Sequence, residues 1–312
     1  MKKMYKFIMA PLAGITDRAF REIVKEYGAD LTFTEMVNVK GLYYKDEKTF
    51  RLVDIGEDEK NVGIQIFGRD IEIIKKVTYD YLNTLAVDVI DFNFGCPAPK
   101  IFKNNEGSAL LKEPKLMGDI IKAIKENTDK MVSSKIRIGI DRDLLNYMEV
   151  LESLEDAAPD FITVHARTRK GYYHEDVNYE AIKKMVEKST IPIVANGGIF
   201  DIETLKKQEE TGAKSFMVAR GALGNPLIFR SLKEGKNLRL SFDERMDLIF
   251  KHYRKMIEYK GERLALFEMR KHIAWYLKGL KSSNKIKNEI NNEKSIERVF
   301  ELLDKYRNNQ EN

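Results

Sequence analysis

The single cysteine of the chain, Cys96, is the first side chain whose position suggests chemistry. It stands between Gly95 and Pro97, just past a short apolar run. An unperturbed thiol has a pKa of about 8.5 and therefore carries its proton at neutral pH. We expect Cys96 to act as a general acid, because a nucleophilic role would require activation of the thiol. The alternative is an inert buried cysteine.

Polar side chains and glycines follow or interrupt several other short apolar runs. Gln65 and Lys135 lie within two of these runs. Gly197 and Gly198 would let backbone N–H groups approach an anion closely. Arg220 adds a planar guanidinium group that suits phosphate oxygens. This set predicts a site for a phosphorylated molecule, the alternative being that the glycines only make tight turns.

The elements that must position these side chains follow from the hydrophobic pattern. Short runs rich in Val, Ile or Phe are typical of parallel strands buried on both faces. We expect strands at residues 7–9, 31–33, 62–67, 89–92, 133–137, 161–165, 192–196 and 215–219. Apolar positions spaced at 3.6 residues predict helices at 70–82, 114–124, 143–154, 179–186 and 201–207, and one more that Thr16 caps and Gly28 ends.

The order of these elements predicts an α/β fold of the (β/α)8 TIM-barrel class. Eight strand–helix units over about 230 residues match the usual barrel length of ~250, and a doubly wound sheet is the alternative. Barrel active sites lie at the C-terminal ends of the strands, and a phosphate often binds after strands seven and eight. Gln65 and Lys135 would then lie under a phosphorylated cofactor, and FMN fits. No G-x-G-x-x-G motif follows a strand, so we expect no resident dinucleotide.

The C-terminal part has no strand pattern. Ser241 and Glu244 form an S-x-x-E capping box that predicts a helix, and further helices are expected at 262–280 and 296–306. We therefore expect a catalytic barrel domain at 1–238 and a small all-helical domain at 239–312. Residues 263–287 hold seven basic residues and one acidic residue, with Trp275 and Tyr276 among them. This stretch suits a polyanion, although a solvated lysine-rich face would have the same composition.

Composition sets the outer limits of the prediction. The 312 residues, 43% hydrophobic and 33% charged, indicate ordinary globular protein and exclude wholesale disorder. No apolar run approaches the ~18 residues of a membrane span, and the apolar run before Pro11 is too short for a signal peptide, so we expect a cytoplasmic protein without a membrane partner. The four histidines show no metal-ligand spacing, so we expect no metal, and Glu268 and His272 are expected to form a surface pair.

Seven ordered segments resemble the tRNA-dihydrouridine synthases, most closely their bacterial B-type branch. They span nearly all of the expected barrel, and their combination is more specific than any one of them. The C-terminal part is similar in architecture more than in motif. The segments are residues 10–17, 93–97, 107–111, 135–139, 165–168, 196–199 and 219–226.

The resemblance implies an enzyme that holds FMN and reduces the C5–C6 double bond of particular uridines in folded tRNA. NADPH would reduce the flavin, the flavin would deliver hydride to C6, and Cys96 would protonate C5. The resemblance also implies a monomer whose basic tail grips tRNA. It assigns flavin contacts to Pro11, Leu12, Ala13, Gln65, Lys135 and His165, phosphate contacts to Asn196, Gly197, Gly198, Ala219 and Arg220, and uracil contacts to Asn93 and Arg137.

The chain departs from the family pattern at a few positions. Gly198 stands where the family often has Asp, and Ala219 stands where it often has Gly. Both lie at the expected phosphate loops, so these departures bear on the affinity for the phosphate more than on the assignment to the family. One rival is an FMN barrel that reduces a small molecule, such as a dihydroorotate dehydrogenase-like enzyme, which leaves the basic tail unexplained. Another is a non-catalytic RNA-binding protein, which leaves Cys96 and Lys135 unexplained.

Overall fold

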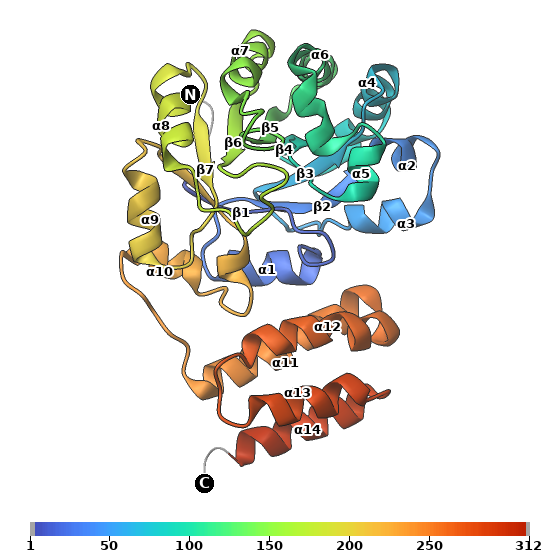
Figure 1. The fold of residues 1–312 in the computed structure, drawn as a ribbon. Coiled ribbons are helices and arrows are strands. Elements are labelled where there is room, and N and C mark those ends of the chain that lie inside the picture. Colours follow the sequence, from blue (N-terminus) through green and yellow to red (C-terminus); the bar gives the residue numbers. More distant parts are fainter. Residues whose placement is uncertain (1–3, 310–312) are drawn as a thin grey trace.

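A computed structural model describes residues 4–309, and its centre is a barrel of eight parallel strands (Figure 1). The hydrogen-bonded order is β1-β8-β7-β6-β5-β4-β3-β2. A parallel bridge between Ile8 and Leu31 joins the two ends, and Met9 N donates to Leu31 O at 2.9 Å. The (β/α)8 prediction is confirmed and the open doubly wound sheet is excluded. The strands are β1 (Phe7–Met9), β2 (Thr32–Asn38), β3 (Val62–Phe67), β4 (Val89–Phe94), β5 (Met131–Arg137), β6 (Phe161–His165), β7 (Ile193–Asn196) and β8 (Ser215–Val218).

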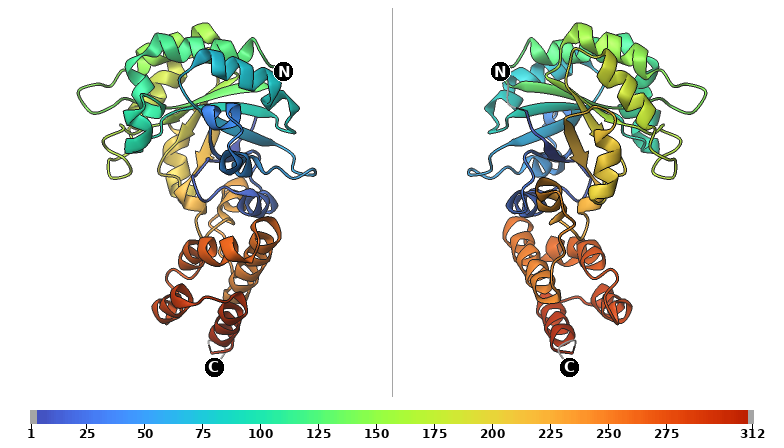
Figure 2. Two further views of the ribbon diagram at one scale, coloured as in Figure 1. Left: turned by 90° about the vertical axis from the view of Figure 1, so that its right-hand side faces the viewer. Right: turned by 90° about the vertical axis from the view of Figure 1, so that its left-hand side faces the viewer.

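Helices surround the barrel because the apolar side of each packs on the strands (Figure 2). Four of the helices predicted from periodicity begin within one residue of the expected position. The helix predicted at 143–154 begins only at Tyr147, because Asp141 Oδ1 accepts from Asp143 N and Leu144 N in a preceding turn. The barrel helices are α1 (Arg18–Glu26), α2 (Val39–Tyr43), α3 (Glu47–Phe50), α4 (Ile71–Asp80), α5 (Pro99–Lys103), α6 (Pro114–Lys125), α7 (Tyr147–Ala157), α8 (Tyr179–Lys188), α9 (Ile202–Glu209) and α10 (Ile228–Glu234).

The N-terminal cap of α1 differs from the prediction. Asp17 is the cap, since its Oδ1 accepts from Phe20 N at 3.0 Å. The hydroxyl of Thr16 is instead used in the preceding turn, where Thr16 Oγ1 accepts from Leu12 N at 3.0 Å. Gly28 follows the helix with φ of +101°, a conformation that favours glycine, as expected.

Four further helices form a small bundle, in which α11 and α12 lie next to α1 and α13 and α14 lie farther from the barrel (Figure 1). The capping box of the first is confirmed: Ser241 Oγ accepts from Glu244 N at 3.2 Å, and Ser241 N donates to Glu244 Oε2 at 2.7 Å. The second and fourth match the predicted helices, whereas the third was not predicted, because Ile286 and Ile290 are its only buried apolar residues. The helices are α11 (Phe242–Lys260), α12 (Glu262–Tyr276), α13 (Ser283–Asn292) and α14 (Ile296–Asn308).

Helix α1 joins this bundle to the barrel because it has two apolar faces. Phe20 and Val24 belong to the core of the barrel, while Ala19 and Ile23 pack into the hydrophobic cluster of α11, α12, α13 and α14. His272 of α12 is only 1% exposed and lies with its ring centroid 5.5 Å from that of Phe20 and 4.4 Å from that of His252. The expected surface pair of Glu268 and His272 is therefore wrong, since docking against α1 buries the imidazole.

The structure bears on two of the functional classes considered above, membrane proteins and metalloproteins. Among residues 4–309, no helix is both long enough and apolar enough to cross a bilayer. Over the same residues, no group of three or more His, Cys, Asp or Glu side chains is arranged to hold a metal ion.

Candidate active site

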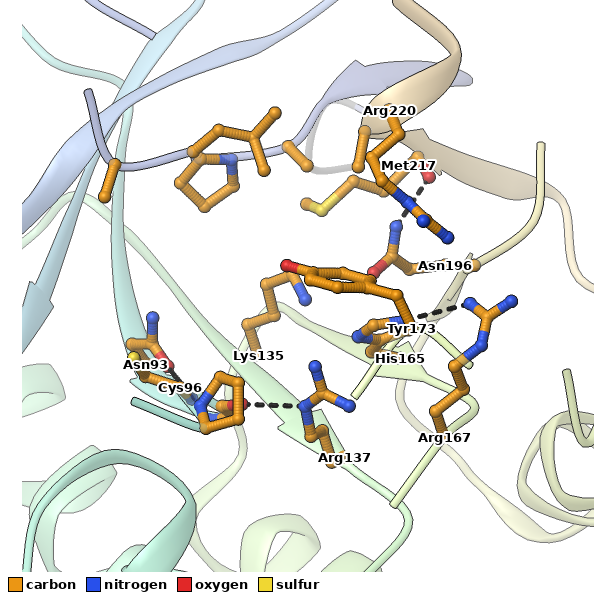
Figure 3. A pocket seen from close by; sticks show the side chains of 18 of the residues that line it. Asn93, Cys96, Lys135, Arg137, His165, Arg167, Tyr173, Asn196, Met217 and Arg220 are labelled. Carbon is orange, nitrogen blue, oxygen red and sulfur yellow. Dashed lines mark hydrogen bonds between the residues drawn. The ribbon is translucent and has the colours of Figure 1, made fainter. Parts of the chain in front are cut away.

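A cavity of about 980 Å³, the open solvent at its mouth included, lies at the C-terminal ends of the strands (Figure 3). Both the β1–α1 loop and the turns after β7 and β8 contribute to its wall. Met36, Arg167, Tyr173, Phe200 and Met217 also line the cavity but were not singled out from the sequence. Every residue singled out for a role does line it: Pro11, Leu12, Ala13, Gln65, Asn93, Cys96, Lys135, Arg137, His165, Asn196, Gly197, Gly198, Ala219 and Arg220.

The backbone of the cysteine loop is held from several sides. Asn93 Oδ1 accepts from Gly95 N at 2.9 Å and from Cys96 N at 2.8 Å. Arg137 Nε donates to Gly95 O at 2.9 Å. Cys96 O accepts from both the backbone N, at 3.1 Å, and the Oγ, at 2.7 Å, of Ser108. The thiol therefore stands on a loop whose position is fixed by hydrogen bonds rather than by apolar contacts alone.

A chain of buried polar groups supports this loop from below. Asp91 is fully buried and accepts from Gln65 Nε2 and from Ser133 Oγ, each at 2.6 Å. The other end of the Gln65 amide, Oε1, accepts from Asn93 Nδ2 at 2.7 Å. Asp91 thus fixes which way the Gln65 amide points, and Gln65 in turn orients Asn93. Burial raises the pKa of Asp91 to about 6, although the two hydrogen bonds and the charge of Lys135 oppose the rise.

Four cationic side chains converge on the cavity, and no carboxylate is among the lining residues within the described part of the chain. Burial, then the charge of Arg137, lowers the pKa of Lys135 to about 8. Burial also lowers the pKa of Arg137 to about 10. Burial, together with the positive charges of Lys135, Arg137, Arg167 and Arg220, holds the pKa of His165 well below its usual range. The imidazole is therefore neutral at pH 7. An anionic ligand in the cavity would relieve the repulsion among the four cationic side chains.

The Cys96 thiol keeps its proton in this setting. Burial raises its pKa above the usual value, and the Ala98 N–H and the charges of Arg137 and Lys135 offset this only in part. A thiol that is protonated at neutral pH can donate a proton directly to a bound substrate.

The turn after β7, where the sequence predicts an anion site, contains two glycines in unusual backbone conformations. Gly197 has φ of +124° and Gly198 has φ of +74°, conformations that L side chains rarely adopt. A Cβ at Gly198 would lie 2.9 Å from Val177 Cγ2, so the close packing there also requires glycine. Asn196 Nδ2 donates to Met217 O at 2.8 Å, which ties the end of β7 to β8 and to the adjoining Arg220 turn.

The loop between β6 and α8 brings an unpredicted aromatic ring to the cavity (Figure 3). The guanidinium of Arg220 lies 4.5 Å from the ring centroid of Tyr173, and that of Arg137 lies 5.9 Å away. The His165 ring is 6.1 Å from the same centroid. The loop has no hydrophobic periodicity, and the sequence signal that could have found it is the pair Tyr172-Tyr173 beside an expected strand end.

The basic residues of the 263–287 stretch do not form a single free surface. Arg263, Lys278, Lys281 and Lys285 are exposed. Arg270, in contrast, is partly buried and donates through Nη2 to Glu293 O at 2.8 Å. One aromatic residue of this stretch lies in the core, because Tyr276 is fully buried and its hydroxyl lies 3.1 Å from His252 Nδ1.

Comparison with known proteins identifies similar sequences over almost the whole chain. A family model described as "Dihydrouridine synthase (Dus)" matches residues 8–311. A "Probable tRNA-dihydrouridine synthase" of Helicobacter pylori is 34% identical over 307 residues, covering 96% of this chain and 91% of the relative. The "tRNA-dihydrouridine synthase B" of Pasteurella multocida is 35% identical over 285 residues, covering 88% and 84%.

One solved structure shares the fold at low sequence identity. It is a crystal structure of DHODH in complex with ferulenol from Eimeria tenella, with 14% identity and a TM-score of 0.52. The match covers 73% of this chain and 79% of that one. At this identity the likeness supports the barrel fold alone.

Proposed function

The chain belongs to the dihydrouridine synthase family, and we propose that it binds FMN and reduces the C5–C6 double bond of specific uridines in tRNA with NADPH as the reductant. The observation that carries the proposal is the cavity itself. It combines four cations, no lining carboxylate and one buried protonated thiol. A phosphorylated flavin supplies the anion that such a cavity requires, and a double-bond reduction uses the proton.

The residues present fit FMN by their chemistry. Asn196, Gly197 and Gly198, with Ala219 and Arg220, would hold the phosphate through backbone groups and one guanidinium. Lys135, Gln65 and His165 lie deeper, and with Pro11, Leu12 and Ala13 would contact the flavin ring. When bound and reduced by NADPH, the flavin would supply hydride to C6 of the uracil.

Cys96 completes the reduction by giving its proton to C5. The resulting thiolate regains a proton from solvent before the next turnover. A uracil in tRNA is stacked, so it must be extruded into the cavity at a cost of a few kcal/mol. The loop that carries the thiol is held by Asn93 and Arg137, whose hydrogen bonds to Gly95 and Cys96 fix the donor relative to the base.

The hydrogen bonds of Asn93 support a different role from the uracil contact that the resemblance implies. Its Oδ1 accepts two backbone N–H groups, and its Nδ2 lies 2.7 Å from Gln65 Oε1 and 2.9 Å from Met36 Sδ. The hydrogen-bonding groups of this amide are thus used within the protein. We therefore assign Asn93 to positioning of the thiol. Arg137 uses Nε and Nη1 on carbonyl groups and lines the cavity, where it can also face the substrate.

The hydrophobic cluster of α11, α12, α13 and α14 is separate from the main cluster of the barrel, which supports a division of the chain into two domains. Residues 1–238 would form the catalytic domain, and residues 239–312 would form a tRNA-binding domain in a cytoplasmic monomer. The exposed cations of the 263–287 stretch would contact RNA phosphates, which position the substrate without specifying the base.

The experiment that tests this function separates the two half-reactions. Cys96→Ala should leave the reduction of bound FMN by NADPH unchanged and slow dihydrouridine formation in tRNA by about 10²- to 10⁴-fold, the usual contribution of a general acid. Cys96→Ser, which keeps a weaker proton donor, should retain more activity than Cys96→Ala. Undiminished product formation by Cys96→Ala would show that the proton comes from elsewhere.

A further inference from the structure

Helix α12 contacts the two loops that flank the seam between the first and last strands of the barrel. Lys271 Nζ donates to Gly14 O in the β1–α1 loop. One turn later, the backbone of Trp275 packs against Gly224 in the loop after β8, where an added Cβ would lie 2.5 Å from both Trp275 C and Trp275 O. Residues at i and i+4 share one helix face, so a single face of α12 touches both loops.

The first contact reaches the cavity through a tight turn. Gly14 directly follows Leu12 and Ala13, which line the cavity, and its φ is +70°. Glu35 of β2 accepts from Gly14 N, so the N–H of Gly14 is held by the barrel and its C=O by α12. Both polar atoms of Gly14 are therefore held by side chains of other elements, and the bond from the Lys271 ammonium is charge-assisted, which makes it stronger than a neutral hydrogen bond.

The second contact reaches the cavity through a short 3-10 turn. Leu223 N donates to Arg220 O at 3.1 Å, and Ala222 N donates to Ala219 O at 3.1 Å. These bonds fix the turn from Ala219 to Leu223, and Gly224 follows directly. A shift of Trp275 against Gly224 would therefore press on the turn that carries the guanidinium we assign to the flavin phosphate.

A partly buried ion group centred on Lys260, the last residue of α11, links α12 to the start of α1. Lys260 Nζ lies 2.8 Å from Asp17 Oδ2 and 2.6 Å from Glu268 Oε2. The side chain of Asp17 is only 5% exposed and also caps α1. Partial burial makes this group less sensitive to salt than a surface pair. The Lys271 contact is therefore part of a fixed interface rather than an isolated surface bond.

We propose that α12 braces the flavin site, and that Lys271 is a positioning residue for the flavin-facing loop rather than a contact to RNA. This inference rests on the proposed function, because it requires FMN in the cavity. It gives the helical region a role in cofactor retention in addition to its role in tRNA binding. Lys271 belongs to the basic stretch that the sequence assigned to a polyanion, but the structure directs its ammonium group into the protein.

The test compares Lys271→Met with Lys278→Met, a change at an exposed lysine of the same basic stretch. The dissociation constant for FMN is measured by flavin fluorescence on the full chain without tRNA. The affinity for unmodified tRNA is measured separately by filter binding over a range of salt. Lys271→Met should weaken FMN binding about tenfold, as expected for the loss of a charged hydrogen bond, and leave the salt slope of tRNA binding unchanged.

Lys278→Met should do the opposite, keeping FMN affinity within twofold and reducing the salt slope by about 0.7–0.9. Lys271→Arg, which keeps a donor for Gly14 O, should restore FMN affinity, and Gly224→Ala should weaken it as Lys271→Met does. A Lys271→Met protein with unchanged FMN affinity and a reduced salt slope would overturn the proposal. A wild-type protein that binds no FMN would overturn the proposed function itself, and the brace with it.

Discussion

Removal of the Asn93 side chain gives a quantitative test of how the thiol is positioned. Asn93→Ala deletes an acceptor for Gly95 N and Cys96 N and a donor to Gln65 Oε1. Each such bond contributes a net of about 0.5–1.5 kcal/mol. Water from the open cavity can replace the partner of Gly95 N, so we expect a loss of about 2 kcal/mol in stability. For a chain of 312 residues, with an unfolding entropy of about 2.1 cal/mol/K per residue, that loss corresponds to a melting temperature lower by roughly 3 °C.

The functional effect should exceed the effect on stability. A displacement of the reacting group by about 1 Å can slow a reaction by about 10²-fold. The assay is the single-turnover oxidation of pre-reduced enzyme by tRNA, alongside the rate of flavin reduction by NADPH. Asn93→Ala should slow the oxidation by tRNA by about 10²-fold. It should leave the rate of flavin reduction by NADPH within about twofold, because that reduction needs no proton from Cys96.

Asn93→Asp is the matched control. The carboxylate still accepts from Gly95 N and Cys96 N, but it cannot donate to Gln65 Oε1. The variant should therefore lose stability while keeping more of the tRNA-dependent step than Asn93→Ala does. An Asn93→Ala protein that oxidises with tRNA at the wild-type rate would refute the conclusion that this amide positions the thiol.

Three further predictions concern the cofactor and the RNA. Arg220→Ala should weaken FMN binding by at least tenfold and weaken riboflavin binding much less, since a charged hydrogen bond to phosphate is lost; equal losses for both ligands would contradict the phosphate assignment. Because burial and Arg137 lower the pKa of Lys135 to about 8, its positive charge disappears as pH rises through that value. FMN affinity should fall across this range and Lys135→Met should lack the step, as titration from pH 6.5 to 9.5 would reveal. Lys285→Gln should reduce the salt slope of tRNA binding by about 0.7–0.9 with FMN affinity unchanged, and an unaltered slope would remove Lys285 from the RNA surface.

The barrel could be predicted from the sequence because its strands are buried on both faces. The runs at 7–9, 62–67 and 161–165 were predicted to the residue, and each begins directly after a polar residue: Lys6, Asn61 and Asp160. The second strand was predicted too short, because Thr34 and Glu35 interrupt its apolar run. Both are buried, and their partners, Gln65 N and Gly14 N, come from other elements that only the fold brings near.

The candidate site was predicted more completely than the contacts that support it. The residues proposed to donate the proton and to hold the cofactor lie in the last residues of strands or just past them, where their types stand out against apolar neighbours. The burial of His272 and the inward bond of Lys271 depend on docking between α12 and α1, about which local periodicity carries no information. Tyr173 lies in a long loop without hydrophobic periodicity, so the sequence could draw attention to the Tyr172-Tyr173 pair but could not place the ring beside Arg220.

The most direct test of the central claim is the visible absorption spectrum of the purified protein, followed by incubation with NADPH and unmodified tRNA and assay of dihydrouridine by nucleoside mass spectrometry. We predict a flavin spectrum that bleaches with NADPH, is restored by tRNA, and is accompanied by dihydrouridine in the RNA. A flavin spectrum without dihydrouridine, in a tRNA set that contains every candidate uridine, would contradict the account. The cavity would then belong to the reductase of a small molecule, and the basic residues of α12 and α13 would need another partner.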